Sequence, residues 1–179
     1  MKITKRNYLI LFVLALIFTA PGLIAFISYQ HPQLFLVNTT NKGELLNPPV
    51  LFNDIASDQS KWRLIYWHPE NCEATCLKKI DKLARIRLAL GRHLYEVEEW
   101  LVVAKDNQQI DAKMEKLLNE HDIHLLRISS TTMSKLPVFN SKPKIFIANS
   151  KGYLVLAYKE NSKPQDIYQD MKQLLKKSG

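Results

Sequence analysis

The sequence of 179 residues contains only two cysteines, Cys72 and Cys76, so thiol chemistry has to use this pair. It also lacks a dense run of lysine or arginine, although its formal net charge is +8, and it contains no nucleic-acid-binding motif. This distribution argues against a nucleic-acid partner and favours a negative membrane surface or an acidic protein. The chain has no internal repeat and no stretch of low complexity.

No charged residue occurs between Arg6 and Lys42. Within this gap, the run from Tyr8 to Tyr29 is almost wholly apolar. As a helix this run would span about 33 Å, which is enough to cross a bilayer. Basic residues precede the run and none follows it closely, which predicts a cytoplasmic N-terminus. The alternative is a cleaved signal peptide, with Thr19-Ala20 as the candidate cleavage site.

These features divide the chain into four expected segments. A cytoplasmic N-terminus over residues 1–7 precedes a transmembrane anchor over residues 8–29. Residues 30–60 are expected to form a tether and entry segment with room for a short pairing strand, and residues 61–177 a folded domain. We therefore expect a single-pass protein of the cytoplasmic (inner) membrane, with its C-terminal domain on the periplasmic, extracytoplasmic side. A cysteine pair can cycle there between oxidised and reduced states.

The cysteine pair follows an apolar, strand-like run and precedes a segment of helical period. At such a junction the first sulfur lies over a helix N-terminus, where free amide groups and the helix dipole favour a thiolate. The spacing leaves three residues between Cys72 and Cys76, so a disulfide would require Cys72 to lie just outside the helix. Two thiolates at this spacing would also suit Cu(I). A structural disulfide, or two unreactive thiols, is the alternative.

From residue 61 onward, strand-like and helical patterns alternate. Buried strands are predicted at residues 62–67, 100–104 and 124–128, and helical spacing occurs at residues 77–88 and 110–118. A polar loop through residue 141, a hairpin of strands at 144–148 and 153–158, and a last helix complete the order. This order predicts an α/β fold: a thioredoxin-like mixed sheet flanked by helices, preceded by one N-terminal transmembrane helix.

The membrane anchor, the thioredoxin order and the Cys72-x-x-x-Cys76 pair together resemble the Sco/SenC family. The resemblance implies a copper-handling assembly factor for the CuA centre of cytochrome c oxidase. Copper as Cu(I) would be held by Cys72 and Cys76, and the partner would be an oxidase subunit or another thiol-containing client. The resemblance also implies association with the membrane and no nucleic-acid partner.

The sequence departs from the Sco pattern at two places. The segment Phe139 to Pro143, before the hairpin, contains no histidine where the family supplies a metal ligand, and Asn71 stands where a histidine usually precedes the first cysteine. Pro143 instead falls where thioredoxin-type enzymes carry a cis-proline beside the cysteines; an ordinary strand-start proline is the alternative. His68, four residues before Cys72, is the candidate third metal ligand, and a partly exposed loop histidine is its alternative.

Three functions are compatible with these observations. The first is an oxidase-assembly factor that acts on copper or on the thiols of the CuA subunit. The second is a general extracytoplasmic thiol-disulfide oxidoreductase, in which Cys72, Cys76 and Pro143 would be the catalytic residues. The third is a non-catalytic assembly scaffold with a fixed Cys72–Cys76 bridge. Any enzyme activity would be at most that of a thiol-disulfide oxidoreductase.

Overall fold

The computed structural model describes residues 5–30, 41–55, 61–105, 111–140 and 142–178. The chain divides into two compact units, Met1–Thr40 and Asn41–Gly179. The first four residues of the predicted cytoplasmic N-terminus lie outside the described residues. So do residues 31–40 and 56–60 of the predicted tether and entry segment.

The first unit contains helix α1 (Lys5–Gln30). Its stretch Asn7–Ile27 has a mean hydropathy of 2.7 and is long and apolar enough to cross a membrane. The large apolar side chains of this stretch are exposed. α1 therefore has the length and composition of a membrane span, which an N-terminal signal sequence would share.

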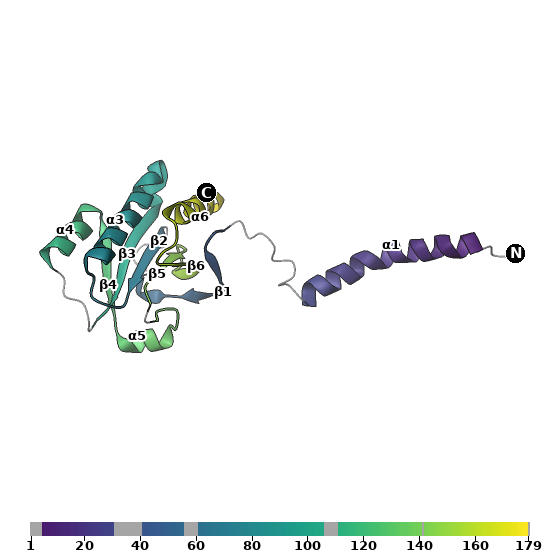
Figure 1. Cartoon of the computed structure of the whole chain (residues 1–179), viewed down its shortest axis with the longest axis horizontal. Coiled ribbons are helices and arrows are strands. Elements are labelled where there is room, and N and C mark those ends of the chain that lie inside the picture. Colours follow the sequence, from purple (N-terminus) through teal and green to yellow (C-terminus); the bar gives the residue numbers. More distant parts are fainter. Residues whose placement is uncertain (1–4, 31–40, 56–60, 106–110, 141, 179) are drawn as a thin grey trace. The chain divides into compact units, whose positions relative to one another are not determined.

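The second unit is built on one mixed sheet (Figure 1). Its strands are β1 (Glu44–Leu51), β2 (Trp62–His68), β3 (Val97–Ala104), β4 (Ile123–Ile128), β5 (Lys144–Ala148) and β6 (Tyr153–Lys159). The spatial order is β1-β6-β5-β2-β3-β4, with β2, β3 and β4 parallel and the remaining pairings antiparallel. This sheet, with its flanking helices, confirms the predicted fold class.

Helices cover both faces of the sheet because its central strands are buried on both sides. α3 (Ala74–Ala89), α4 (Ala112–Glu120) and α6 (Pro164–Ser178) pack on one face, where Leu83, Leu118 and Met171 belong to the first core. The opposite face carries a second core around Trp67 and Phe139, covered by α5 (Ser130–Lys135) and the short helix η1 (Asn53–Ile55). A further short helix, η2 (Gly91–Glu96), leads into β3.

Two elements lie where the sequence indicated loop or tether. β1 falls in the predicted entry segment and pairs with β6 at the edge of the sheet. An edge strand has a neighbour on one side only, so the missing amide hydrogens of the prolines at positions 48 and 49 break no hydrogen bond to a second strand. α5 interrupts the segment predicted as a polar loop, so that part of the prediction is wrong. The Ser129 side chain caps α5 by accepting from the Thr132 amide, and Met133 and Leu136 pack on the second core.

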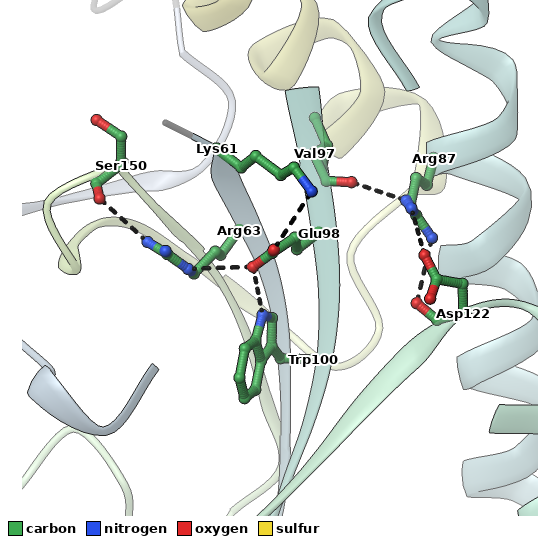
Figure 2. Close-up of polar contacts among 8 residues, drawn as sticks. All are labelled: Lys61, Arg63, Arg87, Val97, Glu98, Trp100, Asp122 and Ser150. Atoms are coloured by element: carbon green, nitrogen blue, oxygen red, sulfur yellow. Dashed lines mark hydrogen bonds and ion pairs between the residues drawn. The ribbon is translucent and has the colours of Figure 1, made fainter. Parts of the chain in front are cut away.

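A buried ionic network ties the strands together at the amino-terminal ends of β2 and β3 (Figure 2). Arg63 is fully buried; its Nε lies 3.4 Å from Glu98 Oε2, and its Nη1 donates to the carbonyls of Asn149 and Ser150. Trp100 Nε1 donates to the same Glu98 carboxylate. The network therefore fixes the β5–β6 turn against β2 and β3, at the end of β2 opposite the cysteine pair.

Candidate functional site

The two cysteines form a disulfide at the junction between β2 and α3. Their Cα atoms lie 5.1 Å apart. Glu73, the residue before α3, has an extended backbone (φ −85°, ψ −168°), so Cys72 lies outside the helix and only Cys76 lies within its first turn. The Cα separation lies within the range that a disulfide requires. The position of Cys72 just outside the helix is the one that the sequence required for a bridge.

The two sulfur-bearing residues differ in exposure. Cys76 is fully buried in the first core, whereas Cys72 is half-buried and packs at its margin. An incoming thiolate therefore reaches the disulfide from the side of Cys72. The side chain of Glu73 makes no capping hydrogen bond, so it does not compete for the amide groups at the start of α3. Those amides and the helix dipole favour a thiolate beside them after reduction.

His68 is the last residue of β2 and is only 8% exposed. The alternative of a partly exposed loop histidine is therefore wrong. Its Nδ1 lies 3.3 Å from Tyr66 Oη, and Tyr66 Oη donates to Glu160 Oε1 at 3.0 Å. Since the Tyr66 proton is used on Glu160, the contact fits a proton on His68 Nδ1, and a neutral ring in this orientation would carry its lone pair on Nε2. Nε2 would then be the nitrogen that can bind a metal.

The same polar group connects β2 to α3 through Lys79, which donates to the backbone carbonyl of Glu160. Burial, with the adjacent Glu160 carboxylate, raises the pKa of Tyr66 well above its ordinary value, so this hydroxyl remains protonated and donating. Burial lowers the pKa of Lys79, and Glu160 opposes that shift. Sequence reasoning missed Tyr66, Lys79 and Glu160. Side chains two residues apart in a strand point to the same face, so the expected strand over residues 62–67 could have indicated that Tyr66 lies beside His68.

Of the predicted metal ligands, Cys72 and Cys76 are joined to each other in the disulfide. Among the described residues, no group of three or more histidine, cysteine, aspartate and glutamate side chains is arranged to hold a metal ion. The donor chemistry of the pair itself fits Cu(I), because reduction of the bridge yields two thiolates close together. Cys72 and Cys76 would hold that ion, and His68 Nε2 is the nearest nitrogen donor along the chain on the same strand-to-helix connection.

Pro143 lies directly before β5, whose Lys144 pairs with Trp67 of β2. Pro143 therefore adjoins the Lys144–Trp67 pair, near the end of β2 after which the cysteines come in the chain. In the described part of the chain the only cis peptide bond is Asn47–Pro48, so the bond before Pro143 is trans and the interpretation as a cis-proline is wrong. A contact between Pro143 and the cysteines stays a prediction.

The segment that lacks the family histidine is held on the other face of the sheet. Phe139 is buried in the second core, and the carbonyl of Asn140 accepts from Trp67 Nε1 at 2.8 Å. Trp67 and His68 are successive residues of β2, so their side chains point to opposite faces. Phe139 and Asn140 are therefore fixed by packing and by the hydrogen bond from the Trp67 side chain, and the sequence from Phe139 to Pro143 contains no histidine or cysteine that could supply a soft metal ligand.

The sheet order, the helices on both faces and the cysteine pair after a central parallel strand define a thioredoxin-like protein. The chain belongs to the family described as transmembrane-like, thioredoxin-like, C-terminal domain, which matches residues 62–178. No curated protein matches the chain in sequence.

Solved structures of Sco proteins share the fold. Apo Sco1 from Thermus thermophilus superposes with a TM-score of 0.54 at 14% identity, over 78% of this chain and 99% of that protein. Copper-bound ScoI from Arabidopsis thaliana gives 0.53 at 11% identity, over 66% and 86% of the two chains. Copper-bound yeast Sco1 gives 0.52 at 16% identity, over 65% and 78%. These similarities confirm the predicted Sco-like thioredoxin fold.

Proposed function

We propose that the protein is an extracytoplasmic Sco-like assembly factor for cytochrome c oxidase, which uses Cys72 and Cys76 to handle Cu(I) or the thiols of the CuA subunit. The observation that carries the proposal is the asymmetric disulfide at the start of α3: Cys72 is half-buried and Cys76 fully buried. A bridge of this kind has one sulfur open to a partner and one protected leaving group.

The disulfide exchange runs in two balanced steps. A client thiolate attacks Cys72 Sγ, the Cys72–Cys76 bond breaks, and its electron pair leaves with Cys76 Sγ. A second client thiolate then attacks the client sulfur of this mixed disulfide and releases Cys72 as a thiolate. The client is oxidised to a disulfide and the protein is reduced to a dithiol; the reverse sequence reduces a client disulfide.

Copper enters this proposal as cargo. The reduced pair offers two thiolates, which suit Cu(I), whereas Cu(II) would need the nitrogen donors that the segment Phe139–Pro143 lacks. His68 is proposed as a third ligand because its neutral ring would carry the lone pair on Nε2. The similarity of the fold to copper-bound Sco proteins from plants and yeast supports the copper hypothesis.

Location follows from the first unit of the chain. We propose that α1 anchors the protein in the cytoplasmic membrane, with residues 1–7 inside and residues 30–179 outside. The apolar stretch Asn7–Ile27 supports the anchor, and the basic residues before it support the orientation. The boundaries proposed for the folded domain are residues 61–177, with β1 contributed by the preceding entry segment.

A general thiol-disulfide oxidoreductase is the second candidate. The disulfide itself favours it, since exchange at Cys72 requires neither copper nor an oxidase subunit. Pro143, directly before β5, is proposed to lie beside the bound client in that case.

Deletion of the gene in its host separates these candidates. Assembly-factor function predicts reduced cytochrome c oxidase activity after deletion; rescue by added copper indicates copper delivery, and absence of rescue indicates thiol chemistry at the CuA subunit. A complementing Cys72→Ser/Cys76→Ser protein should fail to restore activity. Normal oxidase activity in the deletion strain would contradict the assembly function and leave the general oxidoreductase.

A further inference from the structure

A groove runs between α3 and α6, which contact each other on the face of the sheet that carries the first core. Its volume is about 380 Å³. Ile86 and Ala89 of α3, with Pro164 and Tyr168 of α6, give it an apolar lining. None of the cysteine-site residues described above lines this groove, so it is a separate feature of the folded unit.

The charged residues that line the groove are basic. Lys82 and Arg85 line it from α3, and both are exposed. Lys172, one turn after Tyr168 on α6, holds its Nζ 5.6 Å from the centroid of the Tyr168 ring. The groove therefore presents cations at the rim of an apolar cleft, and this combination suits an anion that carries an apolar tail.

The acidic residues of the two helices leave the groove positive. Asp166 and Asp170 lie on the side of α6 away from Tyr168, because each is two residues from it on a helix. On α3, Asp81 pairs with Arg85 Nε at 3.0 Å. That pair is exposed and therefore weak, and the guanidinium group has further N–H donors that can contact an anion.

We propose that this groove binds an anionic phospholipid of the membrane in which α1 is anchored. Lys82, Arg85 and Lys172 would contact the phosphate, and the apolar lining would take the first part of an acyl chain. The inference rests on the proposed anchor, and it is independent of the copper and thiol chemistry proposed for the cysteine pair.

The chain itself favours a lipid over an acidic protein as the occupant. Ten residues, 31–40, join α1 to Asn41, the first residue of the folded unit, so this connection spans at most about 40 Å. A unit held this near a bilayer meets lipid at a high effective concentration, so even a weak lipid site is occupied. The formal net charge of +8 acts in the same direction, since it attracts the chain to an anionic surface.

A second groove of similar size provides the comparison. It lies between α3 and α4, and its volume is about 400 Å³. Acidic and basic residues both line it, and Lys116 within it lies 3.7 Å from Glu120. An anionic headgroup there would meet carboxylates as well as ammonium groups, so the groove between α3 and α6 is the better lipid site.

The test uses the full-length protein in nanodiscs, with the Cys72–Cys76 disulfide intact. Ala89, which is exposed and lines the groove, is replaced by the photo-crosslinking amino acid p-benzoylphenylalanine. The same replacement at Ala74 is the matched control, because Ala74 is also an exposed alanine of α3 but lines the second groove. The nanodiscs contain phosphatidylcholine alone or phosphatidylcholine and phosphatidylglycerol in equal amounts. After irradiation, intact-mass spectrometry reports the fraction of protein that carries an added phospholipid, and the added mass identifies the lipid.

We expect the phosphatidylglycerol adduct at position 89 to exceed the adduct at position 74 about tenfold, because the lipid phosphate is held at the first groove. Lys82→Glu/Arg85→Glu should reduce the adduct at position 89 about tenfold, since it reverses the charge of the rim. Lys113→Glu/Lys116→Glu makes the same change of charge in the second groove, where both lysines are exposed; it should retain the adduct at position 89.

Equal adduct yields at positions 89 and 74, or equal loss of the adduct in the two double variants, would overturn the inference while the proposed function stands. In membranes of the host, a protein adduct at position 89 in place of the lipid would assign the groove to an acidic partner, and would also overturn it. Failure of the full-length protein to insert into nanodiscs would instead remove the proposed anchor, and this inference with it.

Discussion

At the residue scale, the exposure of the two sulfurs assigns their roles. Cys72 is half-buried outside α3, and Cys76 is fully buried in its first turn. Sequence reasoning located both residues and foresaw that a bridge needs Cys72 outside the helix. It did not predict which sulfur is covered, because burial of Cys76 depends on packing against strands and helices distant in the sequence.

Single serine variants test this assignment. In Cys76→Ser, the remaining Cys72 thiol should react with iodoacetamide at least tenfold faster than the remaining Cys76 thiol in Cys72→Ser, because thiolate reactivity depends on access. Mass spectrometry of the alkylated full-length protein gives both rates. Equal rates in the folded proteins would show that Cys76 is as accessible as Cys72, and would contradict the assignment.

A second residue with a measurable consequence is Glu99 on β3. Its side chain is 1% exposed, and its Oε2 has no hydrogen-bond partner among the residues that the structure describes. Burial raises its pKa to about 8, with Arg87 opposing the shift. The folded protein therefore keeps a proton on Glu99 between the ordinary pKa of 4.5 and about 8, where the unfolded chain releases it. Stability contributed by this group is full below that window and is lost as pH rises through it.

Glu99→Gln should remove this pH dependence. The free energy of unfolding of the wild-type protein should fall relative to that of Glu99→Gln by about 2–4 kcal/mol between pH 5 and pH 8. Urea unfolding of the full chain in detergent, followed by the fluorescence of the tryptophans in β2 and β3, measures the difference. Parallel pH profiles for the two proteins would show that Glu99 is ionised in the folded state.

At the scale of elements, the strands around the cysteine pair could be predicted because their patterns are local. The strands predicted at residues 62–67, 144–148 and 153–158 are found within one residue of those bounds. α5 could not be predicted in this way. Its sequence Ser-Thr-Thr-Met-Ser-Lys has weak helix propensity, and the helix forms because Met133 and Leu136 cover a core made by remote strands.

The ionic network at the start of β2 joins two strands, β2 and β3, and the turn between β5 and β6 (Figure 2). Arg63→Met should destabilise the protein by about 3 kcal/mol, because it leaves the buried Glu98 with one partner fewer and removes the donor to the turn. Arg85→Met removes an exposed pair with Asp81 at 3.0 Å and should cost less than about 1 kcal/mol.

Urea unfolding compares the two variants, and the rate of disulfide reduction by dithiothreitol checks that the cysteine site is intact. Both variants should keep the wild-type reduction rate, because neither residue lies at the end of β2 that carries the cysteines. Equal losses of stability in Arg63→Met and Arg85→Met would show that the buried network contributes no more than a surface pair.

At the scale of the whole molecule, an apolar helix and a thioredoxin-like unit form one chain. The uncharged run predicted the helix directly from composition, and its orientation is a further prediction. A reporter that is active only outside the cytoplasm should be active when fused after Gly179. The matched fusion after residue 7 should be inactive, and the opposite pattern would contradict the proposed topology. A mature N-terminus near Pro21 would instead indicate a cleaved signal peptide.

The whole-molecule function depends on what the reduced cysteine pair binds, and the fold alone does not decide it. The segment Phe139–Pro143 lacks a histidine, and we propose that the thiolates of Cys72 and Cys76 hold the copper. The sequence could identify this pair but not the burial of His68 or its contact with Tyr66, since both arise from pairing within the sheet and from Glu160 after β6.

The reactive role of the pair is tested most directly by an anaerobic competition for Cu(I) between the reduced full-length protein and a chelator of known affinity. We predict that the wild-type protein withdraws one Cu(I) per chain, that Cys72→Ser and Cys76→Ser each abolish this binding, and that His68→Ala weakens it. A wild-type protein that withdraws no Cu(I) from the chelator would contradict copper handling by Cys72 and Cys76.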